Sequence, residues 1–164
     1  MTTQEIIRCV LFGKGVNSES IFDEFLHFAP RWYSKNYWYA LGLAYTCADN
    51  LYPYREYVKA AFSSKRKGRE ALMNEEELKV WKNLPHQVYI YRGMTIEEQE
   101  SGDFGVSWSL SIEKAEFFAY EYTRNHYTKN LTKTVQHLKV DKKDIIAFFN
   151  EREEEEVIYI SHKE

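Results

Sequence analysis

The chain has 164 residues, of which 44% are hydrophobic and 29% are charged, with only 7 Gly and 3 Pro. This length fits one domain with its own hydrophobic core, and the composition excludes a disordered, collagen-like or low-complexity chain. The formal net charge of −3 gives no overall positive field that would attract nucleic acid or an anionic membrane. Nucleic acid would have to bind at a local site.

Cysteine and histidine positions argue against a disulfide framework and against a metal site. Cys9 and Cys47 have no metal-ligand or redox spacing, and the histidines at positions 27, 86, 126, 137 and 162 show no ligand pattern. The longest apolar run, residues 37–45, is far shorter than the roughly 18–20 residues that cross a bilayer. We therefore expect a soluble, cytoplasmic protein with no metal and no membrane association.

The first half of the chain shows helical periodicity. Apolar residues recur at helical spacing within residues 6–11, 21–26, 37–48 and 53–63. Tyr57 falls on the expected apolar face of the fourth helix. A further helix is expected at 75–82, with Asn74 as its N-cap, and Pro85 closes this half.

From Gln87 the pattern alternates, which is typical of strands. Val88, Ile90 and Arg92 share one face of a strand that Gly93 is expected to end. Ser111 is expected to cap a helix with an apolar stripe that includes Ile112, Phe118 and Tyr122. Further extended segments are expected at 105–109, 134–140, 145–149 and 157–160.

Helices followed by strands predict an α+β fold. No repeat and no Gly-, Pro- or Ser-rich linker divides the chain, so we expect a single domain at 1–164. Within it, residues 1–85 form a helical N-terminal region and residues 86–164 form a small β-rich core.

Arg92 is the first candidate for chemistry. Alternation places its guanidinium in phase with two apolar side chains, where a buried positive charge needs an anion. A neighbouring carboxylate would satisfy that need, or the side chain could turn out to water. The functional alternative is a bidentate grip on a phosphate, which the planar fork of arginine suits better than a lysine ammonium.

Ser107-Trp108-Ser109 is the second candidate, in an extended segment between Gly105 and the start of a helix. Alternation sends the hydroxyls of Ser107 and Ser109 to the same side, where they could position a polar partner.

Four consecutive acids, Glu153 to Glu156, precede the last apolar strand and form the third candidate. A charge run is usually a solvated turn. If the strand begins near Glu154, however, Glu154 and Glu156 share a face with Ile158 and are forced towards an interior edge. Like charges and burial both raise carboxylate pKa values, so such a pair is better explained by chemistry than by stability.

Aromatic residues are unusually frequent, with 13 Tyr, 10 Phe and 4 Trp. They can serve in packing, or they can form a stacking surface for nicotinamide, adenine or an exposed base. The basic cluster at 65–69 can likewise be a solvated loop or a contact for a nucleic-acid backbone.

Three motifs in this order resemble the ADP-ribosyltransferase superfamily, specifically its arginine–serine–glutamate branch of bacterial toxins and phage-encoded enzymes. They are Tyr91-Arg92-Gly93, then Gly105-Val106-Ser107-Trp108-Ser109 leading to Phe117-Phe118-Ala119, and Glu154-Glu155-Glu156 running into Val157-Ile158. The resemblance covers about residues 86–160, with Trp108 in place of the usual threonine. It implies a β-sandwich core of the ADP-ribosyltransferase type.

The resemblance also implies roles for individual residues. Arg92 would hold the NAD phosphates, Ser107 would support the catalytic glutamate, Glu156 would be that glutamate, and Glu154 would activate the acceptor. The expected NAD-binding residues are Arg92, Gly93, Ser107, Trp108, Ser109 and Phe118. The run of acids also allows Glu153 with Glu155 as the catalytic register.

The function that follows is an NAD-dependent mono-ADP-ribosyltransferase, a glycosyl-transferring enzyme that releases nicotinamide. The acceptor would be a protein side chain, such as arginine, or a nucleic acid, inside a bacterial cell, with the enzyme acting as a phage effector or as a toxin held by an antitoxin partner. Two alternatives stay open: an NAD glycohydrolase, and a non-enzymatic binding module on the same fold.

Overall fold

The computed structural model describes residues 1–122 and 131–162. It divides the chain into two compact units, Met1–Glu75 and Glu76–Glu164. The second unit thus begins about ten residues before the boundary expected at 85/86. The last helix before the strands, α5 (Glu75–Lys82), lies almost entirely in the sheet-containing unit.

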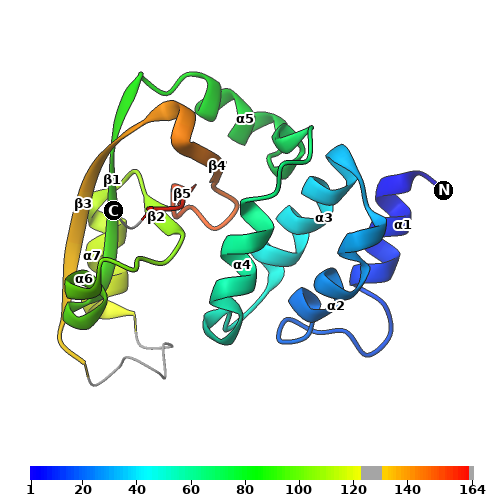
Figure 1. Cartoon of the computed structure of the whole chain (residues 1–164), viewed down its shortest axis with the longest axis horizontal. Coiled ribbons are helices and arrows are strands. Elements are labelled where there is room, and N and C mark those ends of the chain that lie inside the picture. Colours follow the sequence, from blue (N-terminus) through cyan, green and yellow to red (C-terminus); the bar gives the residue numbers. More distant parts are fainter. Residues whose placement is uncertain (123–130, 163–164) are drawn as a thin grey trace. The chain divides into compact units, whose positions relative to one another are not determined.

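Four α-helices form the first unit (Figure 1). They are α1 (Thr3–Leu11), α2 (Ile21–Phe28), α3 (Ser34–Cys47) and α4 (Arg55–Phe62), with short 3-10 turns at Ala29–Arg31, Tyr52–Tyr54 and Arg69–Leu72. The helices coincide with the four segments predicted from apolar spacing. Helix α1 begins with a capping box. The Thr2 hydroxyl accepts from the backbone N–H of Glu5, and the Glu5 carboxylate accepts from the backbone N–H of Thr2.

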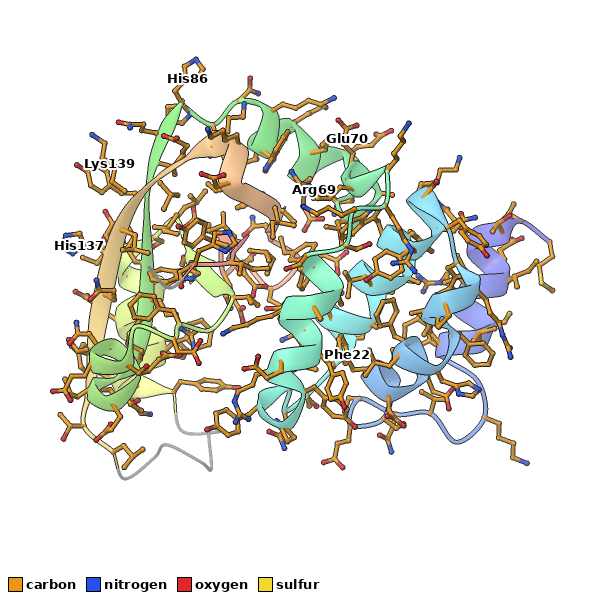
Figure 2. The ribbon with its side chains drawn as sticks, viewed as in Figure 1. Phe22, Arg69, Glu70, His86, His137 and Lys139 are labelled. Atoms are coloured by element: carbon orange, nitrogen blue, oxygen red, sulfur yellow. The ribbon has the colours of Figure 1, made fainter. Side chains whose placement is uncertain are left out.

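Large side chains fill the core of this helical unit. Leu11, Phe25 and Trp38 are fully buried, and the buried ring of Phe22, labelled in Figure 2, lies 5.5 Å from that of Phe25. The hydroxyl of Tyr37 donates to the carbonyl oxygen of Ala61 at 2.7 Å. The predicted apolar face of α4 was wrong at Tyr57, which is 60% exposed.

The second unit contains a five-stranded sheet in the order β3-β1-β2-β5-β4, and every pairing in it is antiparallel. Its elements after α5 are β1 (Gln87–Thr95), α6 (Ile96–Ser101), β2 (Ser107–Ser109), α7 (Ile112–Glu116), a π-helical turn (Phe117–Glu121), β3 (Lys133–Asp141), β4 (Ile145–Phe149) and β5 (Glu156–Tyr159). The fold is therefore α+β, as predicted. A small mixed, mainly antiparallel β-sandwich core was expected. The described strands are antiparallel, and they join one five-stranded sheet because β5 pairs with both β2 and β4.

Gly93 does not end the first strand, contrary to prediction. Strand β1 continues to Thr95, and Gly93 pairs with Val135 of β3. The residue is a glycine because the helical segment after β2 packs directly on it. An added Cβ would lie 2.5 Å from the carbonyl oxygen of Ala115 and 2.7 Å from the backbone nitrogen of Ala119.

Strands β4 and β5 form the buried part of the sheet. All five residues of β4 are buried, and Val157 and Ile158 of β5 are fully buried. Helix α7 is capped as predicted, since the Ser111 hydroxyl accepts from the backbone N–H of Lys114. Its apolar stripe is narrower than expected, because Ala115 and Ala119 are buried while Ile112 and Tyr122 remain exposed.

Within the residues described, no helix combines the length and apolar character that a bilayer crossing requires.

Candidate active site around Ser107

Ser107 joins two of the side chains that the sequence singled out. Its carbonyl oxygen accepts a hydrogen bond from Nη1 of Arg92 at 2.9 Å. Its hydroxyl donates to Oε2 of Glu156 at 2.5 Å, across 49 residues of sequence. The pairing of β2 with β5 makes this second contact, because it sets Ser107 and Ser109 opposite Ile158 and Glu156. Arg92, Ser107 and Glu156 therefore form one connected cluster.

The anion that Arg92 needs is supplied by the protein itself. Nε and Nη2 of Arg92 donate to the two carboxylate oxygens of Glu98, at 3.2 and 2.9 Å, in a bidentate pair at the start of α6. Both side chains are about one-fifth exposed. A partly buried pair of this geometry is stronger than a surface ion pair. A neighbouring carboxylate was one of the expected partners of Arg92, but no sequence pattern pointed to Glu98.

Gly105 completes this corner of the site. Its backbone N–H donates to Oε1 of Glu98 at 3.0 Å, and its Cα faces the Arg92 guanidinium so closely that an added Cβ would lie 2.4 Å from Nη2. A side chain at this position would therefore push the Arg92 guanidinium away from its contacts with Glu98 and Ser107.

The other two residues of the serine motif have structural contacts. Ser109 is buried, accepts from the backbone N–H of Ser111, and donates to the carbonyl oxygen of Glu154 at 2.9 Å. Trp108 is also buried, and its indole N–H donates to the carbonyl oxygen of Gly105 at 3.1 Å. Ser109 thus attaches the acidic turn to β2, and Trp108 holds the loop that carries Gly105.

The acidic run forms a constrained turn ahead of β5. Glu154 and Glu156 are partly buried, whereas Glu153 and Glu155 are exposed and have positive φ angles of 57° and 48°. The prediction of a strand beginning near Glu154 was wrong, because β5 begins at Glu156 and the left-handed backbone at Glu155 interrupts the alternation. The expected burial of the even-numbered pair still results, now through the turn.

Two residues outside the predicted motifs hold this turn. The side-chain oxygen of Asn150 accepts from the backbone N–H of Glu155 at 3.0 Å, and the carbonyl oxygen of Asn150 accepts from the backbone N–H of Glu153. The backbone N–H of Asn150 in turn donates to Oε2 of Glu77 at 2.7 Å. Glu77 is buried, which is an unusual state for a glutamate. Its neighbours Glu75 and Glu76 in α5 are exposed, and no sequence pattern separates Glu77 from them.

Burial raises the pKa of Glu154 above its ordinary value of 4.5, and the positive charges of Arg152 and Lys114 partly oppose that shift. The carboxyl group of Glu154 therefore holds its proton more tightly than an exposed glutamate does.

The strand register assigns these side chains to faces of the sheet. Tyr91 lies opposite Ser109, and Ser109 lies opposite Glu156, so the three side chains share one face. Arg92, which follows Tyr91 directly, starts on the other face. It reaches the cluster through the backbone carbonyl of Ser107 rather than by meeting Glu156.

The remaining predicted NAD-binding residues are Gly93 and Phe118, and both make packing contacts with helical segments. Gly93 is covered by Ala115 of α7 and Ala119 of the π-helical turn. The Phe118 ring packs against Phe117 and Tyr122, with ring centroids 5.6 and 5.2 Å apart.

No group of three or more His, Cys, Asp or Glu side chains within the described ranges could hold a metal ion. Comparison of this chain with protein-family models, with curated proteins and with solved structures found no match.

Proposed function

We propose that this protein is an NAD-dependent mono-ADP-ribosyltransferase, which transfers ADP-ribose from NAD to a macromolecule and releases nicotinamide. The observation that carries the proposal is the Ser107–Glu156 hydrogen bond beside the partly buried Glu154. It supports the roles that the motif resemblance implies for these three residues. In this proposal the enzyme acts in the bacterial cytoplasm as a phage effector or a toxin component.

Glu156 provides the charge that the reaction needs. Cleavage of the bond between ribose and nicotinamide develops positive oxocarbenium character at the sugar, as glycoside cleavage does. A carboxylate held in a fixed orientation stabilises that charge without reorganising during the reaction. The hydroxyl of Ser107 supplies the orientation, since its hydrogen bond to Oε2 fixes the direction of the Glu156 carboxylate.

Glu154 is the proposed general base for the acceptor. A carboxylate whose pKa is raised by burial binds a proton more tightly and is a stronger base than an exposed one. Its turn has the backbone strain that often accompanies function, because residues other than glycine rarely adopt positive φ and both neighbours of Glu154 do so.

Arg92 has a positioning role and a binding role in this proposal. It fixes the Ser107 carbonyl, and through it the strand that presents the Ser107 hydroxyl. Its contacts with Glu98 and Ser107 use three of the five N–H groups of a guanidinium, which leaves two for a phosphate of NAD.

The experiment that tests the proposal measures nicotinamide release and retained ADP-ribose from NAD labelled in the adenosine part, with bacterial lysate as the source of acceptors. Glu156→Gln keeps the shape of the side chain and removes its charge, so release should fall about 100-fold or more. Glu155→Gln is the matched control, since it removes a charge from an exposed neighbour and should stay close to wild type.

Calorimetry of NAD binding and circular dichroism separate chemistry from folding. Glu156→Gln should keep the circular dichroism spectrum and most of the NAD affinity. If wild type releases no nicotinamide above a buffer blank, or if Glu156→Gln is as active as Glu155→Gln, the proposal is wrong. Release without retained label in lysate would instead identify a glycohydrolase.

A further inference from the structure

One face of the β1–β3 ladder carries exposed aromatic and basic side chains. Tyr89 lies opposite Lys139, and Tyr91 lies opposite His137. Tyr89 is 53% exposed, and Nζ of Lys139 lies 5.6 Å from the centre of its ring. Figure 2 shows His137 and Lys139 pointing away from the sheet on β3. We call these four residues the tyrosine face.

The tyrosine face carries positive charge in a chain whose net charge is −3. Lys139 belongs to it, and Asp141, the acid at the end of the same side of β3, is paired with Lys143 at 3.9 Å. Lys133 shares a side of β3 with His137 and Lys139, because these residues alternate along the strand. Strand β3 is an edge strand of the described sheet, and His137 and Lys139 are exposed.

The strand register connects the tyrosine face to the candidate active site through Ser109, which is itself buried. His137, Tyr91, Ser109 and Glu156 stand opposite one another on four consecutive strands, in the order β3-β1-β2-β5. Neighbouring strands lie about 4.8 Å apart, so the backbone of Tyr91 is roughly 10 Å from that of Glu156. A bound chain of nucleotides could span that distance.

We propose that the tyrosine face binds single-stranded nucleic acid and that nucleic acid is the ADP-ribose acceptor. Exposed aromatic rings stack on unpaired bases irrespective of sequence, and lysines beside them neutralise the phosphates. A protein partner with an acidic surface would contact the lysines but would have no need of the exposed Tyr89 ring and the half-buried Tyr91 ring beside it. Binding is independent of the proposed function, whereas the acceptor role rests on it.

The transfer step balances without a further reactant. An oxygen or nitrogen of the nucleotide attacks the ribose carbon of NAD, and the bond from that carbon to nicotinamide breaks. Nicotinamide leaves as a neutral molecule with the electron pair of that bond, and Glu154 takes the proton that the acceptor loses.

Binding is tested by fluorescence anisotropy with fluorescein-labelled 20-nucleotide single strands of mixed sequence, one RNA and one DNA. Polyphosphate serves as a competitor that has charge but no bases. Tyr89→Ala should weaken binding about five-fold or more, the effect of losing one stacked base. Lys139→Gln should weaken it and lower the salt dependence of log Kd by about one.

Matched controls come from exposed positions on other elements. Tyr57→Ala removes an equally exposed tyrosine from α4, and Lys79→Gln removes an exposed lysine from α5. Both should bind as wild type does. If polyphosphate displaces the labelled strands as completely as expected for binding by charge alone, the binding site is refuted. It is refuted equally if Tyr89→Ala and Tyr57→Ala bind the strands with the same Kd.

The acceptor role is tested by adding NAD to each strand and searching it for the mass of ADP-ribose. Labelled protein in lysate with an unmodified oligonucleotide would overturn the acceptor role and leave the proposed function standing. Tyrosine-dependent binding without any nicotinamide release would do the reverse: it would support the binding site and refute the proposed function. Modification that Tyr89→Ala reduces and Tyr57→Ala does not would support both.

Discussion

Replacing Gly93 by alanine should destabilise the sheet unit, because the helical segment after β2 packs on this position. The new Cβ would lie 2.5 Å from the carbonyl oxygen of Ala115, 2.7 Å from the nitrogen of Ala119 and 2.9 Å from the Ala119 side chain. Two of the three atoms belong to the backbone, so no rotation of a side chain relieves the overlap. The strand cannot retreat either, since Gly93 is paired with Val135.

Inserting a methyl group into a packed interface costs about 1–3 kcal/mol. The backbone atoms of Ala115 and Ala119 cannot rotate away, which favours the upper end of that range. For a chain of this length 1 kcal/mol corresponds to a change in Tm of about 2–4 °C. Gly93→Ala should therefore lower Tm by roughly 6–12 °C.

Differential scanning calorimetry at neutral pH measures this shift. Gly13→Ala is the control, because in the helical unit its Cβ would come no closer than 3.2 Å to the carbonyl oxygen of Cys9 and 3.5 Å to that of Val10. A Tm for Gly93→Ala within about 1 °C of wild type would contradict the packing described here. It would also restore Gly93 as a residue that could face NAD.

Three further predictions concern the contacts around the site. Glu98→Gln should lower the free energy of unfolding by about 1–2 kcal/mol in urea titration, and in a double-mutant cycle with Arg92→Lys the two losses should not add; additive losses would argue against the bidentate pair. Glu154→Gln should raise Tm at pH 7, because burial raises the pKa of the Glu154 carboxyl in the folded state. The protonated carboxyl favours folding fully below pH 4.5, and this contribution is lost as pH rises through the folded pKa. The gain over wild type should therefore vanish below pH 4.5, and an equal gain at all pH values would be inconsistent with that shift. Glu77→Ala should cost about 1–3 kcal/mol, because the backbone N–H of Asn150 loses its acceptor, and Glu77→Gln, which retains an acceptor, should cost less; equal losses would exclude this hydrogen bond as the cause.

Local patterns in the sequence predicted most helices and strands, but not α6, which carries Glu98. Helical spacing of apolar residues located α1 to α4, and alternation located β1 and β3, because these periodicities follow from backbone geometry alone. An unbroken apolar run located β4. Alternation also placed Arg92 in phase with Val88 and Ile90, as the register of β1 confirms.

Local patterns failed where a distant segment decided the outcome. Gly93 was expected to end a strand, as glycines often do, but the approach of Ala115 and Ala119 is what requires it. The alternation expected from Glu154 onwards fails at the left-handed backbone of Glu155, a conformation that no apolar or polar period reveals.

The sequence by itself singled out Arg92, Ser107 and Glu156 and predicted the extended segments that carry them. Only the tertiary structure decided their partners. Glu98 satisfies Arg92, and Ser107 holds Glu156 from 49 residues away, because the strand order places β2 between β1 and β5. Strand order depends on long-range pairing, and no local period records it.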